Sequence, residues 1–266
     1  MDAGRGGPTS EYILDNAWGR AQRRLELLHE VHDPGTFERL RRLGIAQGWR
    51  AFVPGGGGGS VVRWLGTTVG PRGRVLATDI DTRFLGGIDD PAVEIRRHDI
   101  VLEPLPDERF DLVAVRLLLI HLPQREAVLE RLVSLLAPGG HILVEEYDLS
   151  FAEGSPDQAW GASARAMIPA LKRLGPDYGW ARVLPLRLHQ LGLDHVGGEV
   201  DLPYFRGGSP TAMFHWLTGE QARDQMASVP DIDRDLFEQT QAALLDGERW
   251  FLPPGMVAAW GRMPGA

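Results

Sequence analysis

The chain of 266 residues contains no cysteine. Disulfides, thiolate zinc sites, iron–sulfur clusters and cysteine nucleophiles are therefore excluded. Lysine is nearly absent as well: Lys172 is the only one, and it lies in no glycine-rich loop, which argues against a lysine-dependent phosphate site. The eight histidines are scattered and form no His-x-x-x-His pair, so we expect no metal site.

An excess of positive charge and a long apolar run are also missing. The formal net charge is −8, which argues against a broad surface for nucleic acid. The most apolar stretch, 112–122, is interrupted by Arg116 and His121 and is too short to span a membrane. Residues 1–10 have no apolar signal region. We therefore expect a cytoplasmic protein that binds neither nucleic acid nor membrane, and a homodimer is compatible with the sequence.

What is present is an alternation of short apolar strands and amphipathic helices. Two N-terminal helices, 17–32 and 36–43, are expected to be separated by a break at Asp33-Pro34-Gly35. Strands are then expected near 50–54, 74–79, 94–98, 111–117 and 141–147, with helices at 60–69 and 124–136. This order predicts an α/β fold with a parallel sheet and helices on both faces.

Beyond residue 150 the pattern loosens. Helices are expected at 157–174, 183–191 and 210–247, the last with a break near Val229-Pro230, and strands at 194–202 and 256–262. We expect one domain with three parts: an N-terminal helical cap (1–48), a cofactor-binding core (49–150), and a lid insertion with the C-terminal strands (151–266). The lid would sit above the carboxyl ends of the strands, where open α/β sheets bind ligands.

A run of five glycines, Gly55 to Gly59, follows the first strand and is followed by Ser60, which opens a helix. Such loops let the backbone approach a ligand closely. A Walker A loop would require a lysine before Ser60, and it is missing. A site for a dinucleotide, or for a nucleoside that carries a sulfonium group, fits the loop better. The Tyr-x-x-x-Lys pair that a short-chain dehydrogenase would need is absent.

Two carboxylates follow the next strands in order. Asp79 ends the second strand, where a carboxylate accepts hydrogen bonds from ribose hydroxyls; the alternative is a helix N-cap. Asp99 follows the third strand, where it is suited to an adenine amino group while Ile100 packs on the ring; the alternative is a solvated turn. The order of glycine loop, Asp79 and Asp99 predicts a nucleoside-binding edge.

These motifs resemble those of the class I S-adenosylmethionine (SAM)-dependent methyltransferases. The resemblance includes the glycine loop, Thr78-Asp79-Ile80-Asp81, Arg97-His98-Asp99-Ile100, Phe110-Asp111-Leu112-Val113 and Leu136-Ala137-Pro138-Gly139-Gly140. The segments 11–18 and 256–261 are similar to a bacterial subgroup with small-molecule acceptors. The resemblance implies a Rossmann-like seven-stranded sheet whose last strand is antiparallel, a helical lid, and SAM as cofactor.

The resemblance also implies roles for individual residues. Cofactor contacts are implied for Gly55, Gly57, Gly59, Asp79, Ile80, Asp99, Ile100 and Arg116. Tyr12 and Trp18 would close over the site from the N-terminal helix. One position departs from the family: Val53 stands where an acid usually precedes the first glycine by two residues.

Methyl transfer to oxygen or nitrogen can require a base. His121, just past the fourth strand, is suited to proton removal; the alternative is a backbone-capping histidine. Glu145, Glu146 and Tyr147 end the fifth strand, and alternation places Glu146 on the face opposite the other two. At least one of them is expected in the cleft, with Glu146 and Tyr147 taken as catalytic candidates; the alternative is a hydrogen-bond anchor.

Trp160 and His215 are expected to contact a small-molecule acceptor, among aromatic residues that also suit a core. The sequence therefore predicts a methyltransferase that acts on a small, natural-product-like molecule. The alternative, favoured by Val53, is a cyclase or pericyclase that has the methyltransferase fold but does not methylate.

Overall fold

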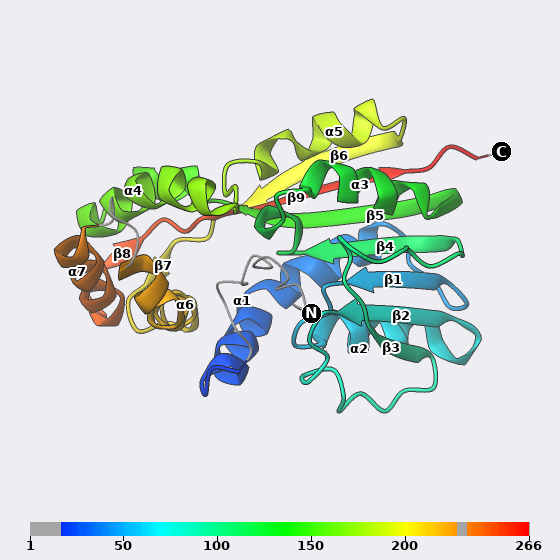
Figure 1. The fold of residues 1–266 in the computed structure, drawn as a ribbon, viewed down its shortest axis with the longest axis horizontal. Helices are drawn as coiled ribbons and strands as arrows, with labels where there is room; N and C mark the ends of the chain where they lie inside the picture. Colours follow the sequence, from blue (N-terminus) through cyan, green and yellow to red (C-terminus); the bar gives the residue numbers. More distant parts are fainter. Residues whose placement is uncertain (1–16, 228–232, 266) are drawn as a thin grey trace, which may run out of the picture.

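A seven-stranded sheet is the centre of the computed structural model, which describes residues 17–227 and 233–265 (Figure 1). In sheet order the strands are β3 (Val93–Arg97), β2 (Arg74–Asp79), β1 (Arg50–Pro54), β4 (Phe110–Arg116), β5 (Leu136–Asp148), β9 (Gly255–Arg262) and β6 (Asp194–Asp201). The first five strands are parallel, and β9 is antiparallel to both β5 and β6. The predicted Rossmann-like sheet with an antiparallel last strand is confirmed.

Helices cover both faces of this sheet. They are α1 (Ala21–Arg42), α2 (Ser60–Val69), α3 (Arg125–Ser134), α4 (Gln158–Leu174), α5 (Leu184–Gln190), α6 (Pro210–Ala227) and α7 (Arg234–Leu245). The C-terminal part of α1 and α2 pack on one face with Val53 and Leu112, whereas α3 and α5 pack on the other with Phe52 and Val113. Because successive strand residues point to opposite faces, the apolar run of β1 has both of its faces buried.

The helix α1 differs from the sequence expectation. A break was predicted at Asp33-Pro34-Gly35, but α1 continues through Pro34 to Arg42. Pro34 removes one backbone donor, and Thr36 Oγ1 lies 3.1 Å from the carbonyl oxygen of His32 one turn earlier. Gly35 leaves room that a side chain would fill, since an added Cβ would lie 2.9 Å from Asp201 Oδ2 and 3.0 Å from an Arg39 nitrogen. Contacts to the sheet therefore outweigh the local helix-breaking preference.

Beyond the carboxyl ends of the parallel strands, α4, α6 and α7 gather with the small sheet of β7 (Phe205–Arg206) and β8 (Trp250–Phe251) (Figure 1). We call this group the lid. Within the lid, helix α6 packs against helix α1. The break predicted near Val229-Pro230 lies outside the described residues. In the described part of the chain, no helix has the length and apolarity required to cross a bilayer.

Candidate functional site

A cavity of about 1000 Å³ lies at the carboxyl ends of β1, β2, β4 and β5 and continues under the lid. Its size is at the upper end of the range for small-molecule sites, roughly 300–1000 Å³. One half is formed by the glycine loop and the residues that follow β2, β3 and β4. The other half is lined mainly by apolar and uncharged polar residues of the lid, among them Trp160, Met167, Phe214 and Thr240. The cavity thus joins a polar edge to an apolar chamber.

The glycine loop adopts backbone angles that favour glycine. Gly55, Gly57 and Gly59 have φ values of +67°, +51° and +80°, which place all three in the left-handed region. Gly55 and Gly57 line the cavity, whereas Gly59 is the N-cap of α2 and lies outside it. An added Cβ on Gly58 would lie 2.4 Å from His29 Cε1. The loop therefore turns tightly beneath α1.

Asp79 connects the second strand to this loop. Its Oδ2 accepts a hydrogen bond from the Gly57 N–H at 2.9 Å, and its Oδ1 accepts from the Asp81 N–H at 3.0 Å. Burial raises the pKa of Asp79, and these backbone donors oppose the rise. Asp79 lines the cavity beside Ile80, which is 51% exposed. The carboxylate retains lone pairs for a ligand, as the predicted ribose contact requires.

Asp99 and Ile100 also line the cavity. Asp99 Oδ1 accepts from the N–H groups of Val101 at 2.8 Å and Leu102 at 3.1 Å. One oxygen of the Asp99 carboxylate thus stabilises a turn, which is the alternative role predicted from the sequence for this residue. Asp99 nevertheless lines the cavity, and its contact with an adenine stays a prediction.

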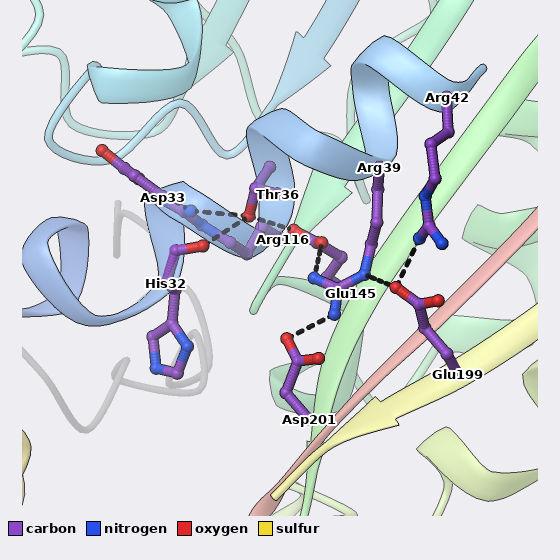
Figure 2. Close-up of polar contacts among 9 residues, drawn as sticks. All are labelled: His32, Asp33, Thr36, Arg39, Arg42, Arg116, Glu145, Glu199 and Asp201. Atoms are coloured by element: carbon purple, nitrogen blue, oxygen red, sulfur yellow. Dashed lines mark hydrogen bonds and ion pairs between the residues drawn. The ribbon is translucent and has the colours of Figure 1, made fainter. Parts of the chain in front are cut away.

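Arg116 belongs to a network that joins α1 to the sheet (Figure 2). We define the α1 ion cluster by its charged members: Asp33, Arg39, Arg42, Arg116, Glu145, Glu199 and Asp201. Arg39 is 2% exposed and pairs with Glu145, Glu199 and Asp201. Burial opposes the charged form of Arg39, but these carboxylates raise its pKa overall.

Thr36 links the two members of the cluster that line the cavity. Its hydroxyl oxygen lies 3.0 Å from an Arg116 nitrogen and 2.6 Å from Glu145 Oε2. Arg116 also reaches Asp33 Oδ1 at 2.9 Å and Ser60 Oγ at 3.3 Å. The cluster therefore extends from β5 to the first residue of α2.

The three residues at the end of β5 have different surroundings. Glu145 and Tyr147 line the cavity, and Glu146 does not. Glu146 Oε1 accepts from the N–H groups of Leu118 at 3.0 Å and Leu119 at 2.6 Å. It thereby holds the backbone after Leu117, a non-glycine residue with φ of +52°. This geometry supports a positioning role for Glu146, in line with the anchor alternative.

Tyr147 lies with its hydroxyl against His32 Nε2, a contact between β5 and α1. Burial raises the pKa of Tyr147 and lowers the pKa of His32 well below its ordinary value. Both side chains are therefore neutral at pH 7. The catalytic assignment of Tyr147 stays a prediction, now with a defined partner.

His121 and His215 both line the cavity. Burial, with Arg24 and Arg125 nearby, lowers the pKa of His121 to about 4, and burial lowers the pKa of His215 to about 3. Both imidazoles are therefore neutral and able to accept a proton at pH 7. His121 is also in edge contact with Tyr178, with ring centroids 5.8 Å apart.

The remaining predicted acceptor contacts differ in placement. Trp160 lines the cavity, and its indole nitrogen donates to the Leu252 carbonyl at 2.8 Å. Trp18 packs against the main hydrophobic cluster and does not line the cavity. Tyr12 lies outside the described residues. In the described part of the chain, no group of three or more His, Cys, Asp or Glu could hold a metal ion.

Sequence reasoning missed the contribution of α1. His29, Asp33 and Thr36 follow one another at helical spacing and face the glycine loop or Arg116. This polar stripe is visible in the sequence. The stripe was not recognised because a helix break was expected at Pro34, which placed His29 in one helix and Thr36 in another.

The comparison with known families agrees with this geometry. Residues 53–144 match the family model described as a methyltransferase domain. This match covers the strands and loops that form the polar edge of the cavity. Residues 53–144 thus form a methyltransferase domain of the class I SAM-dependent type.

Among curated relatives, this chain is 36% identical over 110 residues to methyltransferase str2 of Strobilurus tenacellus, an alignment that covers 39% of this chain and 40% of the relative. It is 29% identical over 162 residues to the ubiquinone/menaquinone biosynthesis C-methyltransferase UbiE of Pseudomonas savastanoi pv. phaseolicola, covering 56% and 63%. The chain thus spans less than two thirds of the length of these relatives.

A solved structure is similar to almost the entire chain in its fold. It is the Haemonchus contortus phosphoethanolamine N-methyltransferase 2 in complex with phosphomonomethylethanolamine and S-adenosylhomocysteine, with a TM-score of 0.61 and 13% sequence identity. The match covers 98% of this chain and 61% of that chain. At this identity the likeness concerns the fold.

Proposed function

We propose that this protein transfers a methyl group from SAM to an oxygen or nitrogen atom of a small, largely apolar natural product. The observation that carries the proposal is that one continuous cavity joins the nucleoside-type edge to the apolar chamber under the lid. The family match and the S-adenosylhomocysteine complex of the Haemonchus relative support the choice of cofactor.

The residues of the polar edge fit such a cofactor. Gly57 lines the cavity without a bulky contact, since the nearest atom to an added Cβ is a backbone oxygen 3.9 Å away. Asp79 would hold the ribose hydroxyls, and Asp99 with Ile100 would hold the adenine. When bound, SAM supplies a methyl group on a positively charged sulfur that leaves as a neutral thioether. The protein must then mainly position the acceptor and exclude water.

The lid half supports an uncharged acceptor. Its lining includes Met167, Leu171, Phe214 and Ala222, and its polar residues Ser163 and Thr240 hydrogen-bond to each other at 2.6 Å. Because a buried charge without a partner is costly, this chamber favours an apolar molecule with few polar groups.

His121 is the preferred base for this reaction. With a pKa of about 4 it is neutral at pH 7 but a weak base, so it is suited to a proton that becomes acidic as the methyl group is transferred. Tyr147 lines the cavity, and its contact with His32 behind it offers a second route for a proton. His215 lies next to Tyr147, with ring centroids 6.3 Å apart.

The test is a methyl-transfer assay with methyl-labelled SAM and a panel of phenols, amines and carboxylic acids. We expect labelled product and S-adenosylhomocysteine to form in equal amounts for at least one apolar acceptor. Conversion of an acceptor without any release of S-adenosylhomocysteine would overturn the proposal in favour of the non-methylating alternative.

A further inference from the structure

The carboxylates of the cavity limit where a positively charged ligand group can be held. Among the described lining residues, the carboxylates are Asp79, Asp81, Asp99 and Glu145. The three aspartates lie at the end of β2 or shortly after β2 and β3, where the nucleoside is proposed to bind. Glu145 is on β5, on the other side of the glycine loop. SAM carries an α-amino acid at the end opposite its adenine, so this end would extend toward β4 and β5.

The end of β1 cannot receive an ammonium group. Val53 is 5% exposed and lines the cavity. Ala114 and Leu143, paired in register on β4 and β5, belong to the same hydrophobic cluster and also line the cavity. An ammonium group placed here would lose water without gaining a partner.

We propose that Arg116 and Glu145 form a subsite for the amino acid end of the cofactor, in which Glu145 binds the ammonium and Arg116 binds the carboxylate. The inference rests on the proposed function. The two residues are paired across β4 and β5, and both line the cavity. The planar guanidinium of arginine matches a carboxylate in shape and charge.

The spacing of the two groups suits an α-amino acid. Thr36 Oγ1 contacts both, at 3.0 Å from Arg116 and 2.6 Å from Glu145 (Figure 2). The ammonium and carboxylate of an α-amino acid are likewise joined through one carbon atom. Helix α1 therefore holds a cation and an anion at a separation that one small zwitterion can bridge.

The charge of the α1 ion cluster points to the same ligand. Four carboxylates, Asp33, Glu145, Glu199 and Asp201, face three guanidinium groups, Arg39, Arg42 and Arg116. The cluster thus has one excess negative charge. Burial raises the pKa of Glu145, while Arg116, Thr36 and Arg39 oppose the rise. The positive sulfonium and ammonium groups of SAM would balance the negative charge that the three guanidinium groups of the cluster leave uncompensated.

Calorimetric titration with three ligands tests this subsite. S-adenosylhomocysteine carries both amino acid groups, its decarboxylated analogue carries only the amine, and 5′-methylthioadenosine carries neither. For Glu145→Gln we expect binding of the first two to weaken about ten- to hundredfold, with 5′-methylthioadenosine unchanged. For Arg116→Gln we expect S-adenosylhomocysteine alone to weaken.

Glu199→Gln is the matched control. Glu199 belongs to the same cluster and pairs with Arg39 and Arg42, but it does not line the cavity. This variant removes the same charge without removing a ligand contact. The affinities for all three ligands should therefore stay within about threefold of those of the unmutated protein, because exposed charges contribute little free energy. Equal losses in Glu145→Gln and Glu199→Gln would overturn the direct contact.

The unmutated protein provides a readout that does not depend on how well a variant folds. We expect S-adenosylhomocysteine to bind at least about tenfold more tightly than 5′-methylthioadenosine, since charge-assisted hydrogen bonds are lost in the smaller ligand. Equal affinities would refute the subsite and leave the cofactor proposal standing. If neither ligand binds, the proposed function fails together with the subsite.

Discussion

Glu146 should make the stability of this protein depend on pH. Its side chain is fully buried, and burial raises its pKa from 4.5 to about 8. The folded state therefore binds a proton between these values that the unfolded state releases, so the free energy of unfolding falls as the pH rises through this window. One pKa unit is worth 1.36 kcal/mol, so the full effect is about 5 kcal/mol. About 4 kcal/mol of this falls between pH 5 and pH 9.

Glu146→Gln isolates this contribution. Its amide oxygen can still accept from the N–H groups of Leu118 and Leu119, as Oε1 does now. Its NH₂ group replaces Oε2, which has no hydrogen-bond partner among the described residues; the protonated acid has the same deficit. The variant should match the unmutated protein at pH 5 and be about 4 kcal/mol more stable at pH 9.

Equilibrium urea unfolding at both pH values, followed by tryptophan fluorescence, measures this difference. Glu130→Gln, on the exposed side of α3, is the control and should follow the unmutated protein at both pH values. If the unfolding free energies of Glu146→Gln and the unmutated protein change in parallel, the buried proton is not on Glu146 and the reasoning is wrong.

Three further predictions concern the site. Asp79→Ala should weaken S-adenosylhomocysteine binding by about 1.5–3 kcal/mol through lost charge-assisted hydrogen bonds, and unchanged affinity in calorimetry would refute the ribose contact. His121→Ala should lower turnover at least about tenfold, since general bases typically contribute 10²–10⁴-fold, with cofactor affinity unchanged; turnover equal to that of the unmutated enzyme would exclude the base role. Gly58→Ala should lower stability by about 1–3 kcal/mol in thermal or urea unfolding, because its Cβ would meet His29. Replacing His29 with alanine as well should restore most of the loss, and a persistent defect would contradict the steric explanation.

The polar edge of the cavity was predictable because each of its parts is local. Gly55 follows β1, Asp79 ends β2 and Asp99 comes shortly after β3, and parallel strands bring their carboxyl ends to one edge. Alternation along β5 also separated Glu146 from its neighbours. These inferences need only the order of elements and the direction of side chains.

The contribution of α1 was not predictable in the same way. Pro34 and Gly35 are helix breakers by local preference, and the contacts that override them come from Glu145 and Asp201, more than 100 residues away. Tertiary contacts of this kind leave no local signal. The lid chamber was anticipated only as a set of aromatic residues, because its shape depends on how α4, α6 and α7 pack together.

The continuity of α1 has a thermodynamic consequence. The same helix contacts α6 of the lid, lies over Gly58 of the glycine loop, and is anchored to β5 and β6 through Arg39. A ligand that binds at the glycine loop and orders α1 therefore also orders α6, which lines the lid half of the cavity. A second ligand that binds in the lid half then causes a smaller loss of conformational entropy. Because binding linkage is reciprocal, the factor by which the cofactor tightens acceptor binding must equal the factor by which the acceptor tightens cofactor binding.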